Sequence, residues 1–432
     1  MKLFRSSDIT PRELRPRYGA EYGQVEETVR EILANVKSRG DAALKEYCLQ
    51  FDRAELSSLA VTDAEIKAAL SKTDSRLLFT MRQAAENIRA FHQKQKREGF
   101  VMTEKEGVLL GQRILPLDRA GLYIPGGTAS YPSTVLMNAI PAKIAGVREI
   151  IMVTPPTADG SIAPQILAAA HIAGVDQIYK VGGAQAIAAL AYGTETIPQV
   201  DKITGPGNMY VATAKRQVYG LVDIDMVAGP SEILIIADES ADPFFVAADL
   251  LSQAEHDPMA AAILLTTDEQ LALAVQSEVA RQLYLLPRRT IAEKSILDHG
   301  RIVVVASLKE AARWSNAIAP EHLELCVEEP FALLALIRHA GSIFLGHYTP
   351  EALGDYFAGP NHTLPTNGTA RFSSPLSVDD FIKKSSFIYY TREALSEVQE
   401  QIVFFAQNEG LEAHAKSVSM RFEFDEDEED ED

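Results

Sequence analysis

The stretch SQAEHDP, residues 252–258, places a glutamine and a histidine, Gln253 and His256, three positions apart behind an apolar helical pattern. Asp242 and Pro243 make a good helix start, so we expect both polar residues in the last turn and on one face. The negative end of the helix dipole favours a cation there, and imidazole is a good zinc ligand. An ordinary polar helix end has the same pattern, however, and the stretch alone favours that interpretation.

Residue types that bind zinc recur near the C-terminus. GDYFAGPNHTLPT carries Asp355 and His362, and EGLEAHAKS carries Glu409 and His414. With the pair at the helix end, Asp355 and His414 would complete a four-ligand site of nitrogen and oxygen without sulfur, which favours a metal centre. On one ideal helix, Glu409 and His414 would lie about 140° apart. They can point the same way only if the helix bends or starts between them.

An acid and an imidazole are adjacent in APEHLEL, as Glu321 and His322. Such a pair can divide acid–base work, because histidine moves protons near neutral pH and glutamate can activate water. A helix-start glutamate beside an exposed histidine is the plainer alternative, and the short motif alone favours it. Cys326 follows at a spacing that would suit a nucleophile, but LELCVEE has the pattern of a buried strand, where cysteine acts as a small hydrophobic residue.

The elements that must position these residues follow from the apolar spacing. Residues 24–98 have helical spacing, with a stop at Gly40 and a start at Asp41. From 121 to 235, and again from 242 to 346, short β-rich runs alternate with helical runs, which predicts mainly parallel sheets. Several of these strands end in glycine or proline, as in VGG, TGPG and AGP, at the sheet edge where α/β proteins bind ligands.

Two further regions differ from this alternation. Residues 350–377 are rich in glycine and proline and predict a long loop, of a kind that is usually either functional or disordered, whereas helical spacing returns from about 391. The GxGxxG fingerprint is missing, so the glycines alone are a weak sign of a dinucleotide.

Composition limits the classes of function. The chain has 432 residues and a net charge of −19, and 425–432 is an unbroken run of acids that predicts a disordered, solvated tail. Basic residues do not cluster, which argues against nucleic acid, and no apolar run is long enough to cross a bilayer. The only cysteines, Cys48 and Cys326, lie far apart, which fits a reducing cytosol and a cytoplasmic protein.

Eight segments together carry a resemblance to a known family. They are DRAGLYIPGGTASYPSTVLMNAIPAKIAGV, VGGAQAIAALAYGT, KITGPGNMYVATAK, AGPSEILIIAD, DLLSQAEHDP, APEHLEL, GDYFAGPNHTLPT and EGLEAHAKS. In this order, over about residues 8 to 421, they resemble histidinol dehydrogenase. The acidic tail is outside the family pattern, and nothing is transferred to it.

The resemblance implies an α/β fold with two incomplete Rossmann-like parallel-sheet domains and small N-terminal and C-terminal helical extensions. The first implied α/β domain carries the zinc and catalytic motifs and comprises 24–122 plus 231–377, and the second lies on the NAD side at 123–230. An N-terminal extension at 1–23 precedes them. A C-terminal helical segment at 378–424, which reaches the partner subunit, and the tail at 425–432 follow them. The resemblance also implies a homodimer whose active sites are shared between subunits.

The same resemblance implies a cytoplasmic enzyme of histidine biosynthesis that oxidises L-histidinol to L-histidine through an enzyme-held aldehyde, with one zinc per subunit and NAD. The implied zinc ligands are Gln253, His256, Asp355 and His414, and the implied catalytic pair is Glu321 and His322. The implied substrate contacts are Ser231, His362 and Glu409, together with the four zinc ligands and His322. The implied NAD contacts are Tyr123, Gln185 and Asn208. The metal would mainly orient the substrate.

Two other classes of function remain open at this point. A zinc hydrolase would use the same ligands with a metal-bound water, and a non-catalytic binding protein would keep only the fold. The glycine-rich strand ends argue for a dinucleotide, and the acid–imidazole pair argues for catalysis. Histidinol-dependent formation of NADH distinguishes the dehydrogenase from both.

Overall fold

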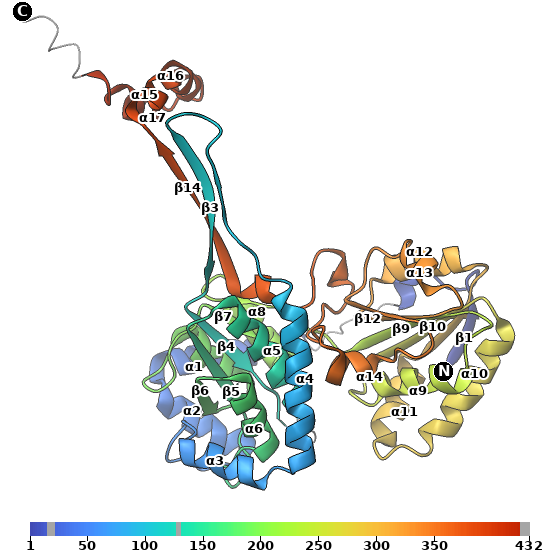
Figure 1. The fold of residues 1–432 in the computed structure, drawn as a ribbon. Helices are drawn as coiled ribbons and strands as arrows, with labels where there is room; N and C mark the ends of the chain where they lie inside the picture. Colours follow the sequence, from blue (N-terminus) through green and yellow to red (C-terminus); the bar gives the residue numbers. More distant parts are fainter. Residues whose placement is uncertain (15–21, 127–130, 424–432) are drawn as a thin grey trace, which may run out of the picture. The chain divides into compact units, whose positions relative to one another are not determined.

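The computed structural model describes residues 1–14, 22–126 and 131–423 (Figure 1). The chain divides into two compact units. Unit 1 comprises Met1–Lys96 and Pro116–Phe381, and unit 2 comprises Arg97–Leu115 and Ile382–Asp432. The acidic tail expected at 425–432 lies outside the described residues.

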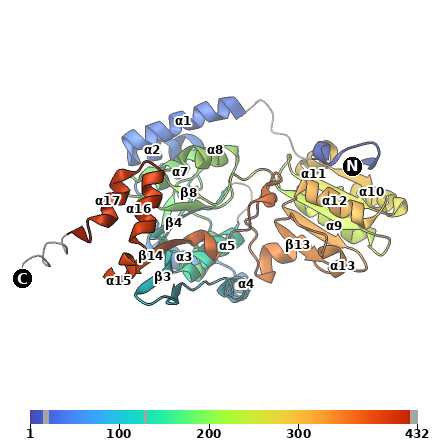
Figure 2. The same ribbon diagram turned by 90° about the horizontal axis from the view of Figure 1, so that it is seen from above.

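One parallel sheet of unit 1 has five strands, in the order β6-β5-β4-β7-β8. They are β4 (Arg119–Tyr123), β5 (Glu149–Thr154), β6 (Gln177–Lys180), β7 (Lys202–Thr204) and β8 (Asp223–Ile224). One face is covered by α1 (Tyr22–Arg39), α2 (Asp41–Tyr47), α7 (Gly183–Tyr192) and α8 (Met209–Val218). The other is covered by α3 (Asp63–Lys72), α4 (Ser75–Gln93), α5 (Pro132–Ala145) and α6 (Pro164–Ala173) (Figure 2).

The helices before residue 96 pack on a different sheet from the one that the sequence-based domain boundaries gave them. Those boundaries placed 24–122 with the zinc-side domain, but the apolar faces of α1 to α4 pack into the two cores of the five-stranded sheet. Helical spacing shows which face of a helix is apolar but not which sheet will bury it. The break expected at Gly40 and Asp41 is confirmed, since α1 ends at Arg39 and α2 begins at Asp41.

The second parallel sheet of unit 1 has six strands, in the order β1-β11-β10-β9-β12-β13. They are β1 (Lys2–Arg5), β9 (Glu232–Ala237), β10 (Ala261–Thr266), β11 (Arg301–Val304), β12 (His322–Cys326) and β13 (Ser342–Leu345). Helices α9 (Pro243–Ala254), α10 (Glu269–Leu283) and α11 (Arg289–Asp298) share a core with one face, and α12 (Leu308–Ile318) and α13 (Pro330–Leu334) with the other. The start of the expected N-terminal extension is thus an edge strand of this sheet.

Together the two sheets confirm the expected α/β class with two parallel sheets. All three cofactor residues implied by the resemblance, Tyr123, Gln185 and Asn208, lie at the carboxyl ends of strands of the five-stranded sheet or on the segments that follow. The predicted catalytic pair, Glu321 and His322, lies at the start of β12 in the six-stranded sheet. Among the described residues, no helix is both long and apolar enough to span a bilayer.

Unit 2 is a three-stranded sheet followed by short helices. Its strands are β2 (Phe100–Met102), β3 (Val108–Pro116) and β14 (Ile382–Tyr390), and its helices are α15 (Arg392–Ser396), α16 (Gln399–Asn408) and α17 (Glu412–Ser419). The segment 378–424, expected to be helical, begins with the 3-10 turn η5 (Val378–Phe381) and continues as the long strand β14 before its helices start. At the crossing of β3 and β14, a Cβ on Gly111 would lie 2.3 Å from the Phe387 ring, so only glycine fits there.

Candidate active site

Glu321 and His322, the pair that the resemblance predicts to be catalytic, lie at the entrance to β12, and both side chains are buried. Glu321 Oε2 accepts a hydrogen bond of 2.8 Å from the backbone N–H of Glu232, the first residue of the neighbouring strand β9. The Nδ1 atom of His322 lies 3.2 Å from the Glu232 carbonyl oxygen and 3.7 Å from Glu321 Oε2. In the neutral form with the proton on Nδ1, which can donate to that carbonyl, His322 has Nε2 available as a base.

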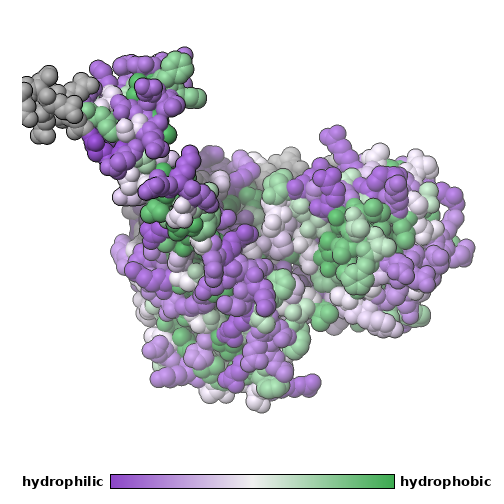
Figure 3. Space-filling model, turned by 45° about the horizontal axis from the view of Figure 1, so that its top comes forward, coloured by the Kyte–Doolittle hydropathy of each residue, from purple (hydrophilic) through white to green (hydrophobic). Residues whose placement is uncertain are grey.

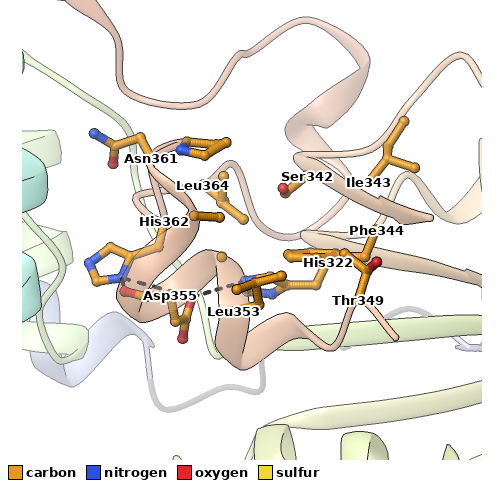
Figure 4. A pocket seen from close by; sticks show the side chains of 13 residues that line it. His322, Ser342, Ile343, Phe344, Thr349, Leu353, Asp355, Asn361, His362 and Leu364 are labelled. Carbon is orange, nitrogen blue, oxygen red and sulfur yellow. Dashed lines mark hydrogen bonds and ion pairs between the residues drawn. The ribbon is translucent and has the colours of Figure 1, made fainter. Parts of the chain in front are cut away.

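Nε2 of His322 faces a carboxylate across a cavity of about 130 Å³ (Figure 4). Asp355 Oδ1 lies 3.8 Å from His322 Nε2 and 3.8 Å from His362 Nδ1. These distances are too long for hydrogen bonds, and His322 Nε2 has no hydrogen-bond partner among the described residues. The carboxylate thus lies between two imidazoles and leaves room for a cation or a polar ligand.

Asp355 lies in a segment that the sequence predicts to be loop. Helix α14 (Glu351–Leu353) continues directly into the π-helical turn η3 (Gly354–Ala358), and Gly359 then ends it with a φ of 113°. A π-turn shifts the side chains within a helix and recurs at functional sites. The extra turn places Asp355 beside the two histidines, while His362 Nδ1 lies 3.1 Å from the Asp355 carbonyl oxygen.

A group of metal-binding atoms surrounds the same carboxylate. One ligand atom each from His256, Glu351 and Asp355 lies within 4.8 Å of the other two. Gln253 is buried, and its Oε1 atom has no hydrogen-bond partner among the described residues. Nitrogen and oxygen ligands without sulfur suit zinc, and an unsatisfied buried oxygen is the kind of group that a metal ion satisfies. These residues therefore fit a metal ion.

The helix that carries Gln253 begins and ends close to expectation. Asp242 caps α9 by accepting a hydrogen bond from Phe244 N, and Pro243 is the first helical residue, as predicted. The helix ends at Ala254, so Gln253 is in the last turn but His256 lies just beyond it. A hydrogen bond of 3.2 Å from His256 N to the Gln253 carbonyl continues the turn and keeps both residues on one side.

Burial and mutual charge shift the pKa values of this site. Burial raises the pKa of Glu321 to about 8 and that of Glu351 to about 7. Burial by itself lowers the pKa of His322, but the carboxylates of Glu351, Glu321 and Asp355 outweigh it and hold that pKa well above the usual value. The excess negative charge is what a bound dication would neutralise.

Glu351 is the residue that sequence reasoning missed. In PEAL it follows a proline and has the pattern of an ordinary first-turn acid. Its spacing of four from Asp355 places the two acids on one helical face, which was the available signal. The other substrate residue expected on this side, Ser231, directly precedes Glu232, and its carbonyl accepts a hydrogen bond of 3.0 Å from Ala261 N.

A second, larger cavity of about 780 Å³ lies at the carboxyl ends of β4 and β5 in the five-stranded sheet. Tyr123, Gln185 and Asn208 all line it, as do Pro155 and Pro156 after β5. The N-termini of α7 and α8 open into it, because Gln185 is in the first turn of α7 and Asn208 caps α8. Helix N-termini at this edge of a parallel sheet suit a dinucleotide phosphate.

The remaining expected residues belong to unit 2. Helix α16 ends at Asn408, Glu409 is its C-cap, Gly410 has a φ of 75°, and α17 begins at Glu412. The break therefore falls between Glu409 and His414, and both line one pocket of unit 2. Glu409 and His414 therefore do not lie on one straight helix, and the separation of about 140° that an ideal helix would give them does not apply.

Comparison with known proteins decides the family. The sequence profile of histidinol dehydrogenase matches residues 15–422. A histidinol dehydrogenase of Listeria monocytogenes is 58% identical over 400 residues, which cover 93% of each chain, and one of Syntrophotalea carbinolica is 59% identical over 399 residues, covering 92% of each. A crystal structure of the Elizabethkingia anophelis histidinol dehydrogenase aligns with a TM-score of 0.92 at 43% identity, covering 98% of this chain and 97% of that one.

The chain belongs to the histidinol dehydrogenase family. It is therefore an oxidoreductase, and its membership assigns it the oxidation of histidinol in histidine biosynthesis. The resemblance found from eight sequence segments is confirmed over nearly the whole chain.

Proposed function

We propose that this enzyme oxidises L-histidinol to L-histidine in two successive steps that use zinc and NAD. The observation that carries the proposal is the buried Glu321–His322 pair, whose free Nε2 atom faces Asp355 beside the metal-binding group. The large cavity lined by Tyr123, Gln185 and Asn208 supplies a place for the dinucleotide. The domain on the five-stranded sheet is the proposed NAD side, and the domain on the six-stranded sheet the proposed zinc side.

Gln253, His256 and Asp355 are the proposed zinc ligands of unit 1, with His414 as the fourth ligand. Zinc, when bound, orients the imidazole and amine of histidinol, and NAD accepts a hydride in each oxidation. Glu351, which shares the space between His256 and Asp355, adds negative charge to the same site.

The protein side chains handle the protons. In the first oxidation His322 Nε2 takes the proton of the substrate hydroxyl, while the Glu232 carbonyl holds the opposite ring nitrogen in its protonated form. The aldehyde must then be hydrated, because a second hydride can leave only from a tetrahedral carbon. Glu321 takes a proton from the attacking water while His322 returns its proton to the aldehyde oxygen, which gives the neutral hydrate. In the second oxidation His322, now unprotonated at Nε2, accepts the proton of a hydrate hydroxyl. His362, Ser231 and Glu409 are the proposed substrate contacts.

The experiment for this proposal is a count of reducing equivalents. Zinc-loaded enzyme with excess NAD and a limiting amount of L-histidinol should form two NADH per histidinol, measured by absorbance, with L-histidine as the product. One NADH per histidinol with accumulating aldehyde would contradict the two-step proposal. No NADH with NAD and zinc present would contradict the cofactor assignment itself.

We also propose a homodimer in which unit 2 completes the active site of the partner subunit. Unit 2 carries large apolar side chains that are largely exposed, including Phe100, Ile388, Phe404 and Phe405. Hydrophobic residues are visible among the hydrophilic ones of this unit in Figure 3. Exposed apolar side chains in such number mark an interaction surface, and two proposed site residues, Glu409 and His414, belong to the same unit.

Subunit mixing tests the sharing of sites. His322→Ala and His414→Ala proteins should each be inactive. After reversible dissociation and mixing in equal amounts, half the dimers are mixed, and each mixed dimer has one site with both histidines intact. The mixture should therefore regain about one quarter of the wild-type activity. Absence of any regained activity, with mixed dimers demonstrated by mass, would show that each subunit uses its own His414. A cytoplasmic location remains part of the proposal, and two free, buried cysteines agree with it.

A further inference from the structure

The large cavity of the five-stranded sheet contains one charged side chain. Among the described residues that line it, Asp52 is the only acid, and no lysine, arginine or histidine lines it. Asp52 is the last residue of the turn η2 (Cys48–Asp52), which is anchored by the fully buried Cys48. The described part of the cavity wall therefore presents a carboxylate, and no cation, to whatever occupies it.

The Asp52 carboxylate is left unsatisfied by the protein. Its Oδ2 atom is buried and has no hydrogen-bond partner among the described residues. Burial raises the pKa of Asp52 to about 6, so the group is ionised at neutral pH. Because buried polar atoms nearly always have partners, a carboxylate at a cavity wall points to a ligand with hydroxyl or N–H donors.

The usual ribose-binding acid is missing from this sheet. In dinucleotide-binding folds a carboxylate after the second strand accepts the hydrogen bonds of the adenosine ribose. Here the strand next to β4 is β5, which ends in Thr154 and continues as Pro155 and Pro156. The nearest acid, Asp159, instead accepts hydrogen bonds from Ser161 and Thr157. Asp52 is thus the only described carboxylate that can take the role.

The residue before Asp52 adds a surface for a base. The Phe51 ring lines the same cavity, is 51% exposed, and stacks on Tyr47 with ring centroids 5.5 Å apart and planes 3° from parallel. A ring held flat by a neighbour and open to the cavity suits a purine base. Phe51 and Asp52 together offer a base contact beside a ribose contact. These contacts suit adenine and its ribose, and the nicotinamide half must serve the proposed base His322, so the half at η2 is assigned to adenosine.

We infer that Asp52 binds the ribose hydroxyls of the adenosine half of the dinucleotide and makes the enzyme select NAD against NADP. The 2′-hydroxyl of NAD donates to the carboxylate, whereas the 2′-phosphate of NADP brings negative charge against it, with no cation among the described lining residues to compensate. Selectivity then comes from repulsion of the wrong ligand as well as attraction of the right one. The inference deepens the proposed function and rests on its NAD site.

Direct binding to the zinc-loaded enzyme tests this without turnover. Calorimetric titrations compare the affinity for NAD with that for NADP, and the affinity for 5′-ADP with that for 2′,5′-ADP. The two ADP ligands lack the nicotinamide half and probe the adenosine end alone. The wild type should bind the ligand without the 2′-phosphate more tightly in both pairs. In Asp52→Asn, which keeps the shape and removes the charge, the affinity ratio within each pair should fall by about tenfold or more.

A neighbouring variant serves as the matched control. Phe51→Leu should weaken both members of each pair by the same factor, since a base contact does not sense the 2′ position. Asp52→Ser provides a second uncharged variant, and thermal melting confirms the fold of all three. Equal wild-type affinity within the pairs, or an unchanged ratio in the folded Asp52 variants, would overturn the inference while leaving NAD binding intact. Failure of the wild type to bind NAD at all would remove the proposed NAD function together with it.

Discussion

Nε2 of the Gln253 amide lies 3.2 Å from Nδ1 of His322. One side chain comes from the end of helix α9 and the other from the start of strand β12, so the proposed metal residues and the proposed base share a contact. With the proton on Nδ1 that a free Nε2 requires, this approach is a contact between two donors and not a hydrogen bond, and in this orientation Oε1 is the unsatisfied atom. Orientation of the base and binding of the metal are therefore linked through Gln253.

Replacement of His322 separates catalysis from metal binding. His322→Ala should keep its zinc, because the group of His256, Glu351 and Asp355 is untouched, and should lose at least about a thousandfold in kcat, the upper range for loss of a general base. Zinc is measured by elemental analysis and kcat by NADH formation. His171→Ala, on the exposed side of α6, is the control and should match the wild type. A His322→Ala protein with substantial turnover would remove the residue from its role.

Replacement of Glu321 should affect the second oxidation more than the first. Burial raises the pKa of Glu321 to about 8, and only the ionised carboxylate can accept a proton from water. The ionised fraction grows with pH, so the rate of aldehyde oxidation should rise through about pH 8 and then level off. Glu321→Gln should still form a first NADH from histidinol, with the aldehyde step slowed by about a hundredfold or more. Stopped-flow absorbance with histidinol and with the aldehyde resolves the two steps, and equal loss in both would contradict the division of labour.

The zinc content of the enzyme should depend on the proposed ligand His256 and, less strongly, on Glu351, a carboxylate beside the ligands. His256→Ala should lose zinc on dialysis, because it removes a proposed ligand. Glu351→Gln should retain zinc more weakly, by about tenfold to a hundredfold, which is typical when a group beside the ligands is changed. Competition with a chelator of known affinity measures both. Full occupancy of His256→Ala under competition would contradict its assignment as a ligand.

The sequence predicts the parts of this site better than their arrangement. The caps at Asp242 and Pro243 and the alternation of strands and helices are local signals, and the structure confirms them. The π-turn that brings Asp355 to the histidines has no such signal, since 350–377 is dominated by glycine and proline. Glu351 was overlooked because a first-turn acid after proline is common.

Tertiary packing explains the other differences. Helices α1 to α4 have clear apolar faces, but only the folded chain shows that the five-stranded sheet buries them. Strand β14 precedes the C-terminal helices, and its pairing partner β3 lies far away in the sequence, so neither the pairing nor the existence of unit 2 follows from local spacing. The site residues implied by the resemblance, including Glu409 and His414, stay predictions until variants are measured.

The two cysteines should be chemically silent in the native enzyme. Burial raises the pKa of Cys48 to about 12 and also raises that of Cys326 strongly, and both thiols are buried. A raised pKa keeps the thiol protonated, and only the thiolate reacts. Between pH 7 and pH 9 a thiol reagent should therefore label neither residue in the native state and both in denaturant. Rapid native labelling with loss of activity would instead point to a reactive cysteine near the site.

A buried ion pair close in sequence to Asn208 should matter for stability. Lys215 and Asp225 form an ion pair with side chains only 2% and 1% exposed. Asp225 Oδ2 also accepts a hydrogen bond of 2.8 Å from Gly205 N, and Lys215 Nζ donates one of 3.0 Å to the Gly205 carbonyl. The pair therefore fixes the turn that leads to Asn208 at the cavity.

Asp225→Asn leaves the Lys215 cation buried without its counter-charge and should cost about 3–5 kcal/mol of unfolding free energy. It should also weaken NAD binding, because the turn before Asn208 loses its support. Asp223→Asn is the control, since Asp223 is 51% exposed and its buried partner Lys202 keeps a second carboxylate, Asp380, at 3.3 Å, so the loss of unfolding free energy should be smaller. Urea midpoints and calorimetric NAD affinities measure the two effects. An Asp225→Asn midpoint equal to that of the control would show that the buried pair contributes nothing to stability.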